Sequence, residues 1–243
     1  MKLLRTLRNM NAIVTGGTKG IGKAIAIKLV KQGFNVAICG RNLQDLKKAE
    51  AEIQAANPQA KVHAYQVDLS KKEQTIVFGR KLQDVFQNNI EIVVNNAGLF
   101  IPGDIHKESD GLLENLMSTN LYSAYHLTRT ILPSMIARRK GHIFNICSVA
   151  SLQAYPNGGS YSITKFALLG FSKNLREELK QYNIKVTAIS PGATMSGSWD
   201  GMNIDPNRIM QAEDIAEVLW TAYKMAPQTL IEDIVLRPIQ GDL

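Results

Sequence analysis

Cysteine is scarce in this chain of 243 residues, which contains two, and aromatic residues make up only 7% of it. Cys39 and Cys147 stand at the ends of apolar, strand-like runs, and their spacing matches no metal site. A disulfide between two such cysteines is uncommon in a reducing compartment. The sequence therefore predicts two buried, unreactive thiols and no metal-binding cluster.

Long hydrophobic runs are also missing. No apolar run approaches the roughly 20 residues that a membrane-spanning helix requires. The start of the chain is basic, but it lacks the continuous apolar segment and the small-residue cleavage site of a secretory signal. On these grounds we expect a cytoplasmic protein with no membrane partner.

The formal net charge is +7, but the chain has no concentrated basic region. Its Lys and Arg residues are scattered, and the densest cluster, Arg138-Arg139-Lys140, contains no aromatic residue. Nucleic-acid-binding proteins usually concentrate such residues in a patch or stripe. The charge balance therefore favours small anionic ligands such as phosphates. A nucleic-acid-binding role, which rests on the net charge alone, stays open as an alternative.

Short apolar runs alternate with amphipathic stretches along the chain, without internal repeats or linker-like segments. This alternation predicts a parallel sheet with crossover helices, and nearly continuous apolar runs indicate strands covered on both faces. We therefore predict one α/β domain over residues 1–243, a Rossmann-type doubly wound parallel sheet of about seven strands with helices on both faces. The expected strands are Ala12–Thr15, Asn35–Cys39, Lys61–Val67, Glu91–Asn95, His142–Cys147, Lys185–Ser190 and Asp233–Leu236.

Helix signals separate the first strands. Ile21–Lys31 places its apolar residues on one face, and Gly33 follows as a terminator. Asn42 is expected to cap the next helix, with Asp45 in position to support that helix end.

A glycine-rich turn runs from Thr15 to Gly22, directly after the first expected strand, and opens into a helix. Glycine allows the backbone to approach a pyrophosphate closely, and a helix N-terminus offers N–H groups and a favourable dipole. The Gly-x-x-x-Gly-x-Gly spacing departs from the usual fingerprint, but its position between strand and helix favours a dinucleotide site. The residues predicted to bind the dinucleotide here are Gly16, Thr18, Lys19, Gly20, Ile21 and Gly22.

The end of the second expected strand lacks the acidic residue that an NAD site normally places there. Arg41 stands at this position instead, and the first carboxylate is that of Asp45. Arg41 can stack on and bind a 2′-phosphate, and Lys19 adds a second positive charge. Each could alone be an ordinary solvated cation, but together they predict NADP(H) as the cofactor.

Tyr161 and Lys165 are one helical turn apart, so they share a helix face. A phenol has a pKa of about 10, and a neighbouring ammonium would lower it toward the range of a general acid or base. Ser148, brought in from another strand, would hold the oxygen that receives the proton. The simpler alternative is a surface Tyr–Lys pair.

With these residues in place, the chain resembles the classical short-chain dehydrogenase/reductase family nearly from end to end. The glycine turn matches the family's own spacing, and Asn95-Asn96-Ala97-Gly98 matches the stretch after its fourth strand. The resemblance makes Asn120, Ser148, Tyr161 and Lys165 the catalytic residues. The further residues that it places at the cofactor are Asp68, Asn96, Ala97, Gly98, Pro191, Gly192, Thr194 and Ser196, besides Tyr161 and Lys165.

The resemblance implies hydride transfer between NADP(H) and a carbonyl carbon, with Tyr161 as the proton donor and Ser148 bound to the carbonyl oxygen. Lys165 would lower the pKa of Tyr161 and hold the nicotinamide ribose, and Asn120 would anchor a water. Taken alone, Asn120 is a polar helix residue and Ser148 a strand cap. Because family members usually form tetramers through the long helices, we expect a homotetramer or a dimer.

The expected substrate loop covers residues 193–211, after the sixth strand. Its apolar residues would form a lid over a moderately apolar substrate or would pack on the domain. The lid residues are Met195, Trp199, Met202, Ile204 and Met210, and the same cleft could be lined by Phe100, Ile101, Leu152 and Tyr155.

Among family members, the chain looks most like 3-oxoacyl-(acyl carrier protein) reductases, which makes a 3-oxoacyl thioester the expected substrate. Arg139 falls at one of two basic positions that meet the acidic carrier protein, but the other position holds Tyr182. Two enzymatic alternatives stay open, a broad carbonyl reductase and a small 3-hydroxy acid dehydrogenase, which Ile234–Pro238 resembles. A third alternative is not an enzyme but a non-catalytic NADP-binding sensor.

Overall fold

A computed structural model describes residues 10–196 and 205–242. Its centre is one parallel sheet of seven strands in the order β3-β2-β1-β4-β5-β6-β7. All seven predicted strands are present, with boundaries shifted by at most one residue, so the predicted doubly wound α/β fold is confirmed. The strands are β1 (Asn11–Thr15), β2 (Asn35–Gly40), β3 (Val62–Gln66), β4 (Ile90–Asn95), β5 (Gly141–Ile146), β6 (Ile184–Pro191) and β7 (Asp233–Leu236).

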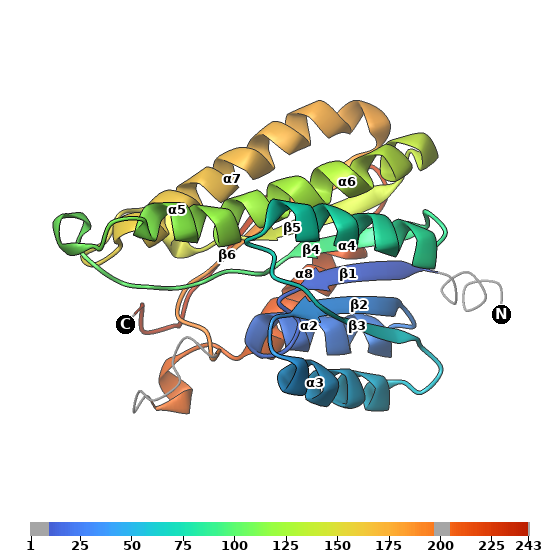
Figure 1. The fold of residues 1–243 in the computed structure, drawn as a ribbon, viewed down its shortest axis with the longest axis horizontal. Helices are drawn as coiled ribbons and strands as arrows, with labels where there is room; N and C mark the ends of the chain where they lie inside the picture. Colours follow the sequence, from blue (N-terminus) through green and yellow to red (C-terminus); the bar gives the residue numbers. More distant parts are fainter. Residues whose placement is uncertain (1–9, 197–204, 243) are drawn as a thin grey trace.

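Helices cover both faces of the sheet (Figure 1). α2, α3 and α8 pack on one face, and α4, α6 and α7 pack on the other, each layer around its own cluster of buried apolar side chains. The bounds are α2 (Gly20–Lys31), α3 (Leu43–Ala56), α4 (Lys72–Val85), α5 (Leu112–Met117), α6 (Ser123–Arg138), α7 (Gly159–Leu179) and α8 (Ala212–Tyr223). Between the two layers β1, β4 and β5 are buried along their whole length, as their apolar runs predict.

The chain reverses its path across the sheet between β1 and β4. From β1 it proceeds outward to β2 and β3, and then returns to place β4 on the other side of β1. In open α/β sheets, a ligand crevice forms beyond the carboxyl ends of the strands at such a reversal. This topology locates the cleft described below.

Local signals end and start the first helices as predicted. After α2, Gly33 takes a φ of +89°, in the left-handed region that glycine adopts without strain. The Asn42 side chain accepts hydrogen bonds from the N–H groups of Gln44 and Asp45, at 2.8 and 3.0 Å, and so caps α3. Both predictions are confirmed.

Polar side chains tie α7 to the middle of the sheet. Asn95 Nδ2 donates to Asn145 Oδ1 at 2.8 Å, and Asn145 Nδ2 donates to Ser172 Oγ on α7 at 2.8 Å. All three side chains are buried, where a hydrogen bond prevents the cost of an unsatisfied polar group. The chain of amides therefore fixes α7 relative to β4 and β5.

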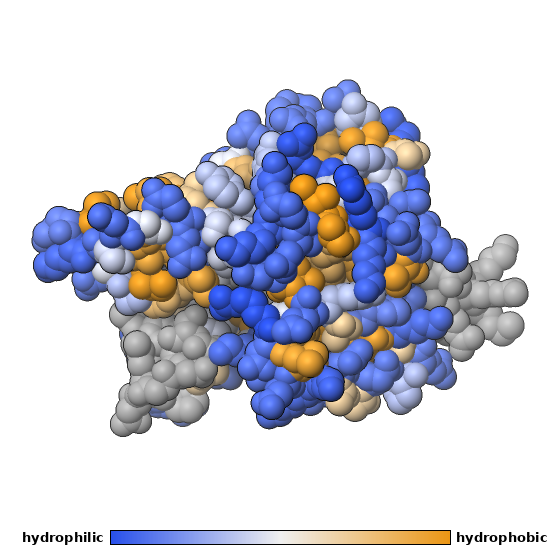
Figure 2. All heavy atoms as spheres, viewed as in Figure 1, coloured by the Kyte–Doolittle hydropathy of each residue, from blue (hydrophilic) through white to orange (hydrophobic). Residues whose placement is uncertain are grey.

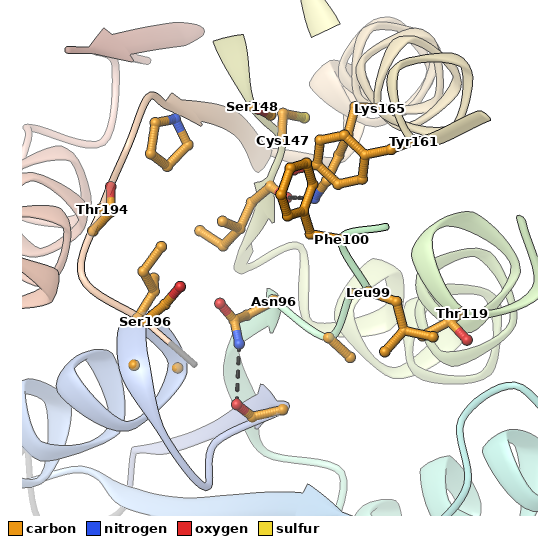
Figure 3. A pocket seen from close by; sticks show the side chains of 18 of the residues that line it. Asn96, Leu99, Phe100, Thr119, Cys147, Ser148, Tyr161, Lys165, Thr194 and Ser196 are labelled. Carbon is orange, nitrogen blue, oxygen red and sulfur yellow. Dashed lines mark hydrogen bonds between the residues drawn. The ribbon is translucent and has the colours of Figure 1, made fainter. Parts of the chain in front are cut away.

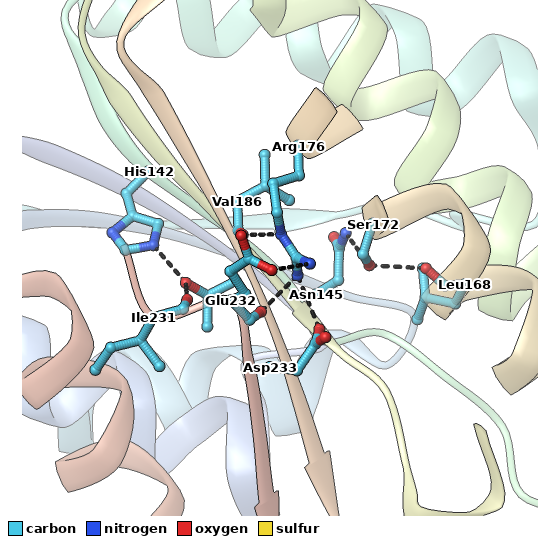
Figure 4. A network of polar contacts seen from close by, with 10 residues as sticks. His142, Asn145, Leu168, Ser172, Arg176, Val186, Ile231, Glu232 and Asp233 are labelled. Carbon is cyan, nitrogen blue, oxygen red and sulfur yellow. Dashed lines mark hydrogen bonds and ion pairs between the residues drawn. The ribbon is translucent and has the colours of Figure 1, made fainter. Parts of the chain in front are cut away.

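Arg176 makes a second tie, from α7 to the edge of the sheet (Figure 4). Its guanidinium donates to Val186 O on β6 at 3.1 Å and to Glu232 O at 2.6 Å, and it pairs with the Asp233 carboxylate at 2.8 Å. Arginine suits this role because its planar group presents several donors in fixed directions. The edge strand β7 is thereby fastened to both β6 and α7.

Both cysteines are buried and free, as predicted. Burial raises the pKa of Cys39 to about 12 and that of Cys147 to about 11, so both thiols stay protonated and unreactive at neutral pH. The face seen in Figure 2 is mainly hydrophilic, and its apolar side chains form small separate groups. In the two described ranges, no helix combines the length and hydropathy needed to cross a bilayer.

His142 on β5 is a buried polar residue held in its neutral form. Its ring stacks on Phe144 with centroids 3.8 Å apart, and Nε2 lies 2.8 Å from Thr187 Oγ1. Because the Thr187 hydroxyl donates to Ile231 O at 2.6 Å, it accepts from His142 Nε2–H. Burial and the Lys185 charge lower the pKa of His142 to about 3.

We predict that His142 makes the fold sensitive to mild acid. As the pH falls from about 6.5 toward 3, the unfolded chain binds a proton that folded His142 does not, so the unfolding free energy decreases. The contribution is at most about 1.4 kcal/mol per pH unit. His142→Gln, which keeps an N–H donor for Thr187, should reduce this slope in urea titrations at pH 7, 6 and 5. An unchanged slope would contradict the prediction.

Candidate active site

A cleft of about 720 Å³ opens beyond the carboxyl ends of the strands (Figure 3). Every residue predicted from the sequence to bind the cofactor lines this cleft, together with Ser148, Tyr161 and Lys165. In Figure 3, Phe100, Tyr161 and Lys165 lie together, and Thr194 and Ser196 face them across the space. Asn120 is not among the lining residues of the described chain.

The glycine turn is held by bonds to the segment after β4. Thr15 Oγ1 accepts from the N–H groups of Asn96 and Ala97, at 2.9 and 3.0 Å. Asn96 Nδ2 returns bonds to Thr15 O at 2.9 Å and to Gly16 O at 3.1 Å. These contacts join the two chain segments that flank the reversal in the sheet, and they fix the floor of the cleft.

Glycines of this turn lie where a side chain would be crowded. Gly16 takes a φ of +62°, and its Cβ would lie 3.1 Å from Ala97 Cα. A Cβ on Gly22 would overlap both Asn96 Nδ2 and Gly16 O. The bare backbone therefore forms a tight cradle at the start of α2. No described side chain caps that helix, and its first turn contains no acidic residue, which fits a bound pyrophosphate.

The rim beyond this cradle carries charges of both signs. Arg41 lines the cleft from the end of β2, Lys19 from the glycine turn, and Asp68 from the residues after β3. Burial tends to raise the pKa of Asp68, but hydrogen bonds from Ser70 and the charges of Arg41 and Lys71 outweigh it and lower the pKa. The positive charges of Arg41 and Lys19 suit a phosphate group of a ligand. The ionised Asp68 carboxylate can accept a hydrogen bond from an uncharged ring of that ligand.

Ser148 is fixed at the end of β5 by its own backbone contacts. Its Oγ accepts from Ala150 N–H at 3.1 Å, and its N–H donates to Ser151 Oγ at 3.1 Å, which forms a capping box for the short helical turn Val149–Ser151. The oriented Ser148 hydroxyl lies next to Tyr161. It can therefore hydrogen-bond to a substrate oxygen that accepts a proton.

Lys165 lies deep in the cleft, with 6% of its surface exposed. Its Nζ donates to Ile146 O at 2.9 Å and lies 5.7 Å from the centroid of the Tyr161 ring. Burial lowers its pKa. The helical spacing therefore brings the ammonium beside the aromatic ring, as the sequence predicts.

The pKa of Tyr161 corrects one prediction. Burial raises it to about 12, and hydrogen bonding with Ser148 only partly opposes this effect. The expected lowering by Lys165 is wrong for this structure, because the ammonium is directed at Ile146 O and the desolvation of the phenol dominates. Tyr161 is consequently protonated at neutral pH and holds a proton that it can donate.

Asn120 lies in a π-helical turn, Ser118–Tyr122, between α5 and α6. Only 1% of its surface is exposed. Its Oδ1 accepts from Leu99 N–H at 2.7 Å, and its Nδ2 donates to Leu99 O at 3.0 Å and to Thr164 Oγ1 at 2.9 Å. Asn120 thus connects the segment after β4 to α7, immediately beside Lys165. Irregular turns of this kind often occur at functional sites.

The expected substrate loop is described only at its ends. Trp199, Met202 and Ile204 lie outside the described residues. Met195 N–H donates to Met210 O at 2.8 Å, and Met210 is partly buried against the core, so this residue packs on the sheet layer as the alternative interpretation holds.

Of the other candidate cleft residues, Phe100 and Tyr155 line the cleft, whereas Ile101 and Leu152 are exposed and do not. The Phe100 ring meets the Tyr161 ring edge-on, with centroids 4.8 Å apart.

Sequence reasoning missed several residues that form or support the cleft, among them Thr15, Arg237 and Asp242. Thr15 has a recognisable signal, because a hydroxyl at the end of a strand can bond to the next segment. Arg237 and Asp242 line the cleft from the C-terminal end of the chain, where they form an ion pair. Asp242 Oδ1 also accepts from Ala193 N–H at 3.1 Å. No local sequence pattern predicts the contacts of Asp242 with Ala193, because they join segments far apart in sequence.

Comparison with known proteins gives consistent matches. The sequence model of the short chain dehydrogenase family matches residues 10–206. An uncharacterised oxidoreductase of Staphylococcus saprophyticus is 30% identical over 236 residues, which are 96% of this chain and 99% of the relative.

Two solved structures are similar over nearly their whole length. A metagenomic short-chain oxidoreductase in complex with NADP has 31% identity and a TM-score of 0.82, over 96% of this chain and 98% of that one. The closed form of a serine dehydrogenase complexed with NADP+ has 29% identity and a TM-score of 0.86, over 96% and 97%.

We predict that the glycine turn tolerates no side chain at Gly22. Gly22→Ala should lower the unfolding free energy by roughly 1–3 kcal/mol, because the added methyl group meets Asn96 and the Gly16 carbonyl. Gly170→Ala is the matched control, because a Cβ on this α7 residue meets no atom within 4 Å. The control should be neutral or stabilising by up to about 1 kcal/mol. Urea unfolding measures both, and equal effects would contradict the crowding at Gly22.

Proposed function

The chain belongs to the short-chain dehydrogenase family, and on this premise we propose that it is an NADP(H)-dependent oxidoreductase that interconverts a carbonyl compound and its alcohol. The observation that carries the proposal is the Tyr161 phenol beside Ser148, in a cleft that also contains a backbone cradle for a dinucleotide. A phenol that can donate a proton, in the same cleft as a phosphate cradle, suits reduction by hydride and proton transfer.

Bound in this cleft, NADPH would supply a hydride to the carbonyl carbon. Tyr161 donates the proton that the carbonyl oxygen needs, so that hydride and proton together give the alcohol. Ser148 donates a hydrogen bond to the same oxygen while negative charge develops on it. Lys165 lies where it can bind a ribose hydroxyl, and Asn120 holds Leu99 and Thr164 in place around this group.

NADP(H) rather than NAD(H) is proposed from the charges at the rim. β2 ends in Gly40, and Arg41 follows it in the cleft with no acidic residue at that position. A guanidinium binds a 2′-phosphate well and would leave a ribose hydroxyl without an acceptor. The two similar solved structures, which contain NADP, support this choice.

Three substrate classes are candidates for the cleft. A 3-oxoacyl thioester, delivered by a carrier protein, remains a candidate, and exposed Arg139 is the cation proposed to meet the carrier. A small 3-hydroxy acid is favoured by Arg237, a cation in the cleft, and by the similarity to serine dehydrogenase. A broad carbonyl reductase would use the apolar wall at Phe100 and Tyr155.

We propose that α6 and α7 pair with a second copy of the chain, in a dimer or tetramer. Four large side chains on these helices or in the turn before α6 are between 37% and 47% exposed: Tyr122, Tyr125, Ile163 and Phe166. Sedimentation velocity tests this, and a monomer at micromolar concentration would contradict it.

A reducing compartment such as the cytoplasm is proposed because both cysteines are free and buried.

Our first prediction for this function concerns turnover. The wild type should oxidise NADPH with at least one member of a carbonyl panel that contains an acetoacetyl thioester, small 3-oxo acids and aromatic ketones. Tyr161→Phe should reduce kcat at least about 100-fold, because the proton donor is lost, and leave NADPH binding nearly unchanged. Fluorescence titration measures the binding. Retained turnover would refute the role of Tyr161, and tight NADPH binding without any wild-type turnover would favour a sensor.

The second prediction concerns cofactor choice. Arg41→Glu should weaken NADPH binding by roughly 10- to 100-fold, because it replaces an attraction to the 2′-phosphate by a repulsion. NADH binding should change by less than about threefold, because NADH lacks that phosphate. Equal losses for the two nucleotides would show that Arg41 does not recognise the 2′-phosphate.

A further inference from the structure

α7 has no N-terminal cap of its own. Its N-cap position is Gly158, which has no side chain, and the first turn of α7 contains no acidic residue. The first turn of a helix leaves backbone N–H groups without intrahelical partners and carries the positive end of the helix dipole. Tyr161 belongs to this turn, so any fraying there would displace the phenol.

Glu108 provides the missing cap from a distant part of the chain. Its Oε1 accepts from Ser160 N–H at 2.8 Å, and Ser160 Oγ donates to its Oε2. Ser160 is 2% exposed and immediately precedes Tyr161. One carboxylate thus satisfies a backbone donor and a buried hydroxyl, and it places a negative charge at the positive end of α7.

The loop that carries Glu108 is fastened to α7 at a second point. Gly103 N–H donates to Asn157 O at 2.9 Å, in the turn before the helix. Gly159 has a φ of +39°, and a Cβ on it would overlap Glu108 Oε1 and Gly103 O. The two segments are therefore packed backbone against backbone, with little freedom for α7 to begin elsewhere.

The same loop forms part of the cleft. It follows Asn96–Gly98 and begins with Leu99 and Phe100, which line the cleft, and the Phe100 ring meets Tyr161 edge-on. Glu108 itself is not among the described lining residues. Its influence on the reaction consequently passes through Ser160 and the helix start, and not through contact with a substrate.

We propose that Glu108 is a positioning residue for proton transfer by Tyr161. It fixes the first turn of α7, and with it the distance and angle of the phenol relative to Ser148. This inference rests on the proposed function, since it concerns the step in which Tyr161 acts. A misplacement of a reacting group by about 1 Å can slow a reaction by roughly 100-fold, so a cap at this point affects rate as well as stability.

The test compares Glu108→Ala with Glu108→Gln. Alanine removes both contacts with Ser160, whereas glutamine keeps an acceptor for Ser160 N–H and a group that can bond to its hydroxyl. Glu108→Ala should lower kcat by roughly 10- to 100-fold, with the Kd of NADPH changed less than about threefold. Glu108→Gln should restore most of kcat. Asp104→Ala is the control, because this carboxylate of the same loop pairs with exposed Lys107 in the described part of the chain, and its loss should leave kcat unchanged.

Hydrogen exchange provides a readout that does not depend on turnover. Residues 160–165 should exchange faster in Glu108→Ala than in the wild type, and Glu108→Gln should restore protection. If Glu108→Ala does not fold, Ser160→Ala, which removes one of the two contacts, takes its place with a smaller loss of kcat. A wild-type kcat in the alanine variants, or equal losses with alanine and glutamine, would overturn the inference.

The two proposals can fail separately. A wild type that turns over no carbonyl would refute the proposed function. In that case, faster exchange over residues 160–165 in Glu108→Ala but not in Glu108→Gln would still support the anchoring role, and unchanged exchange would overturn it.

Discussion

The position of α7 over β5 and β6 is the constraint on which the cleft depends. Tyr161 lies on this helix, and Ser148 lies at the end of β5, so their separation is set by how helix and strand pack. Three side chains along α7 bond to the sheet layer: Lys165 to Ile146 O, Ser172 to Asn145 and Arg176 to Val186 O. Hydrogen bonds between buried groups have defined directions, which apolar packing lacks. They therefore fix both the position of α7 along its own axis and its height above the sheet.

The burial that makes these bonds necessary also determines the protonation of the acid. Desolvation disfavours charge, so it raises the pKa of Tyr161 and lowers that of Lys165. A charged ammonium beside the phenol is not enough to reverse this effect when it is directed at a carbonyl. Burial thus shifts the pKa of Tyr161 away from neutrality, to about 12.

Most of the fold could be predicted because its signals are local. Runs such as β4 and β5 are apolar throughout, since both faces are covered, and Asn42 caps the helix that follows it. The glycine turn could be located for the same reason. The pKa of Tyr161 could not be predicted from the sequence, because it depends on burial and not on helical spacing. Long-range contacts were also missed: Glu108 meets Ser160 across 52 residues, and Asp242 meets Ala193 across 49.

The two sides of the cleft come from different parts of the chain. Arg41 and Asp68 follow β2 and β3, whereas Ser148 and Tyr161 follow β5, and the bonds between Thr15 and Asn96 join the two sides. This division makes the protein modular in an evolutionary sense. The residues proposed to select the nucleotide and those proposed to transfer the proton therefore lie far apart in the gene, so that one group can change without the other. The same property would let an engineer alter coenzyme preference at Arg41 without replacing Ser148 or Tyr161.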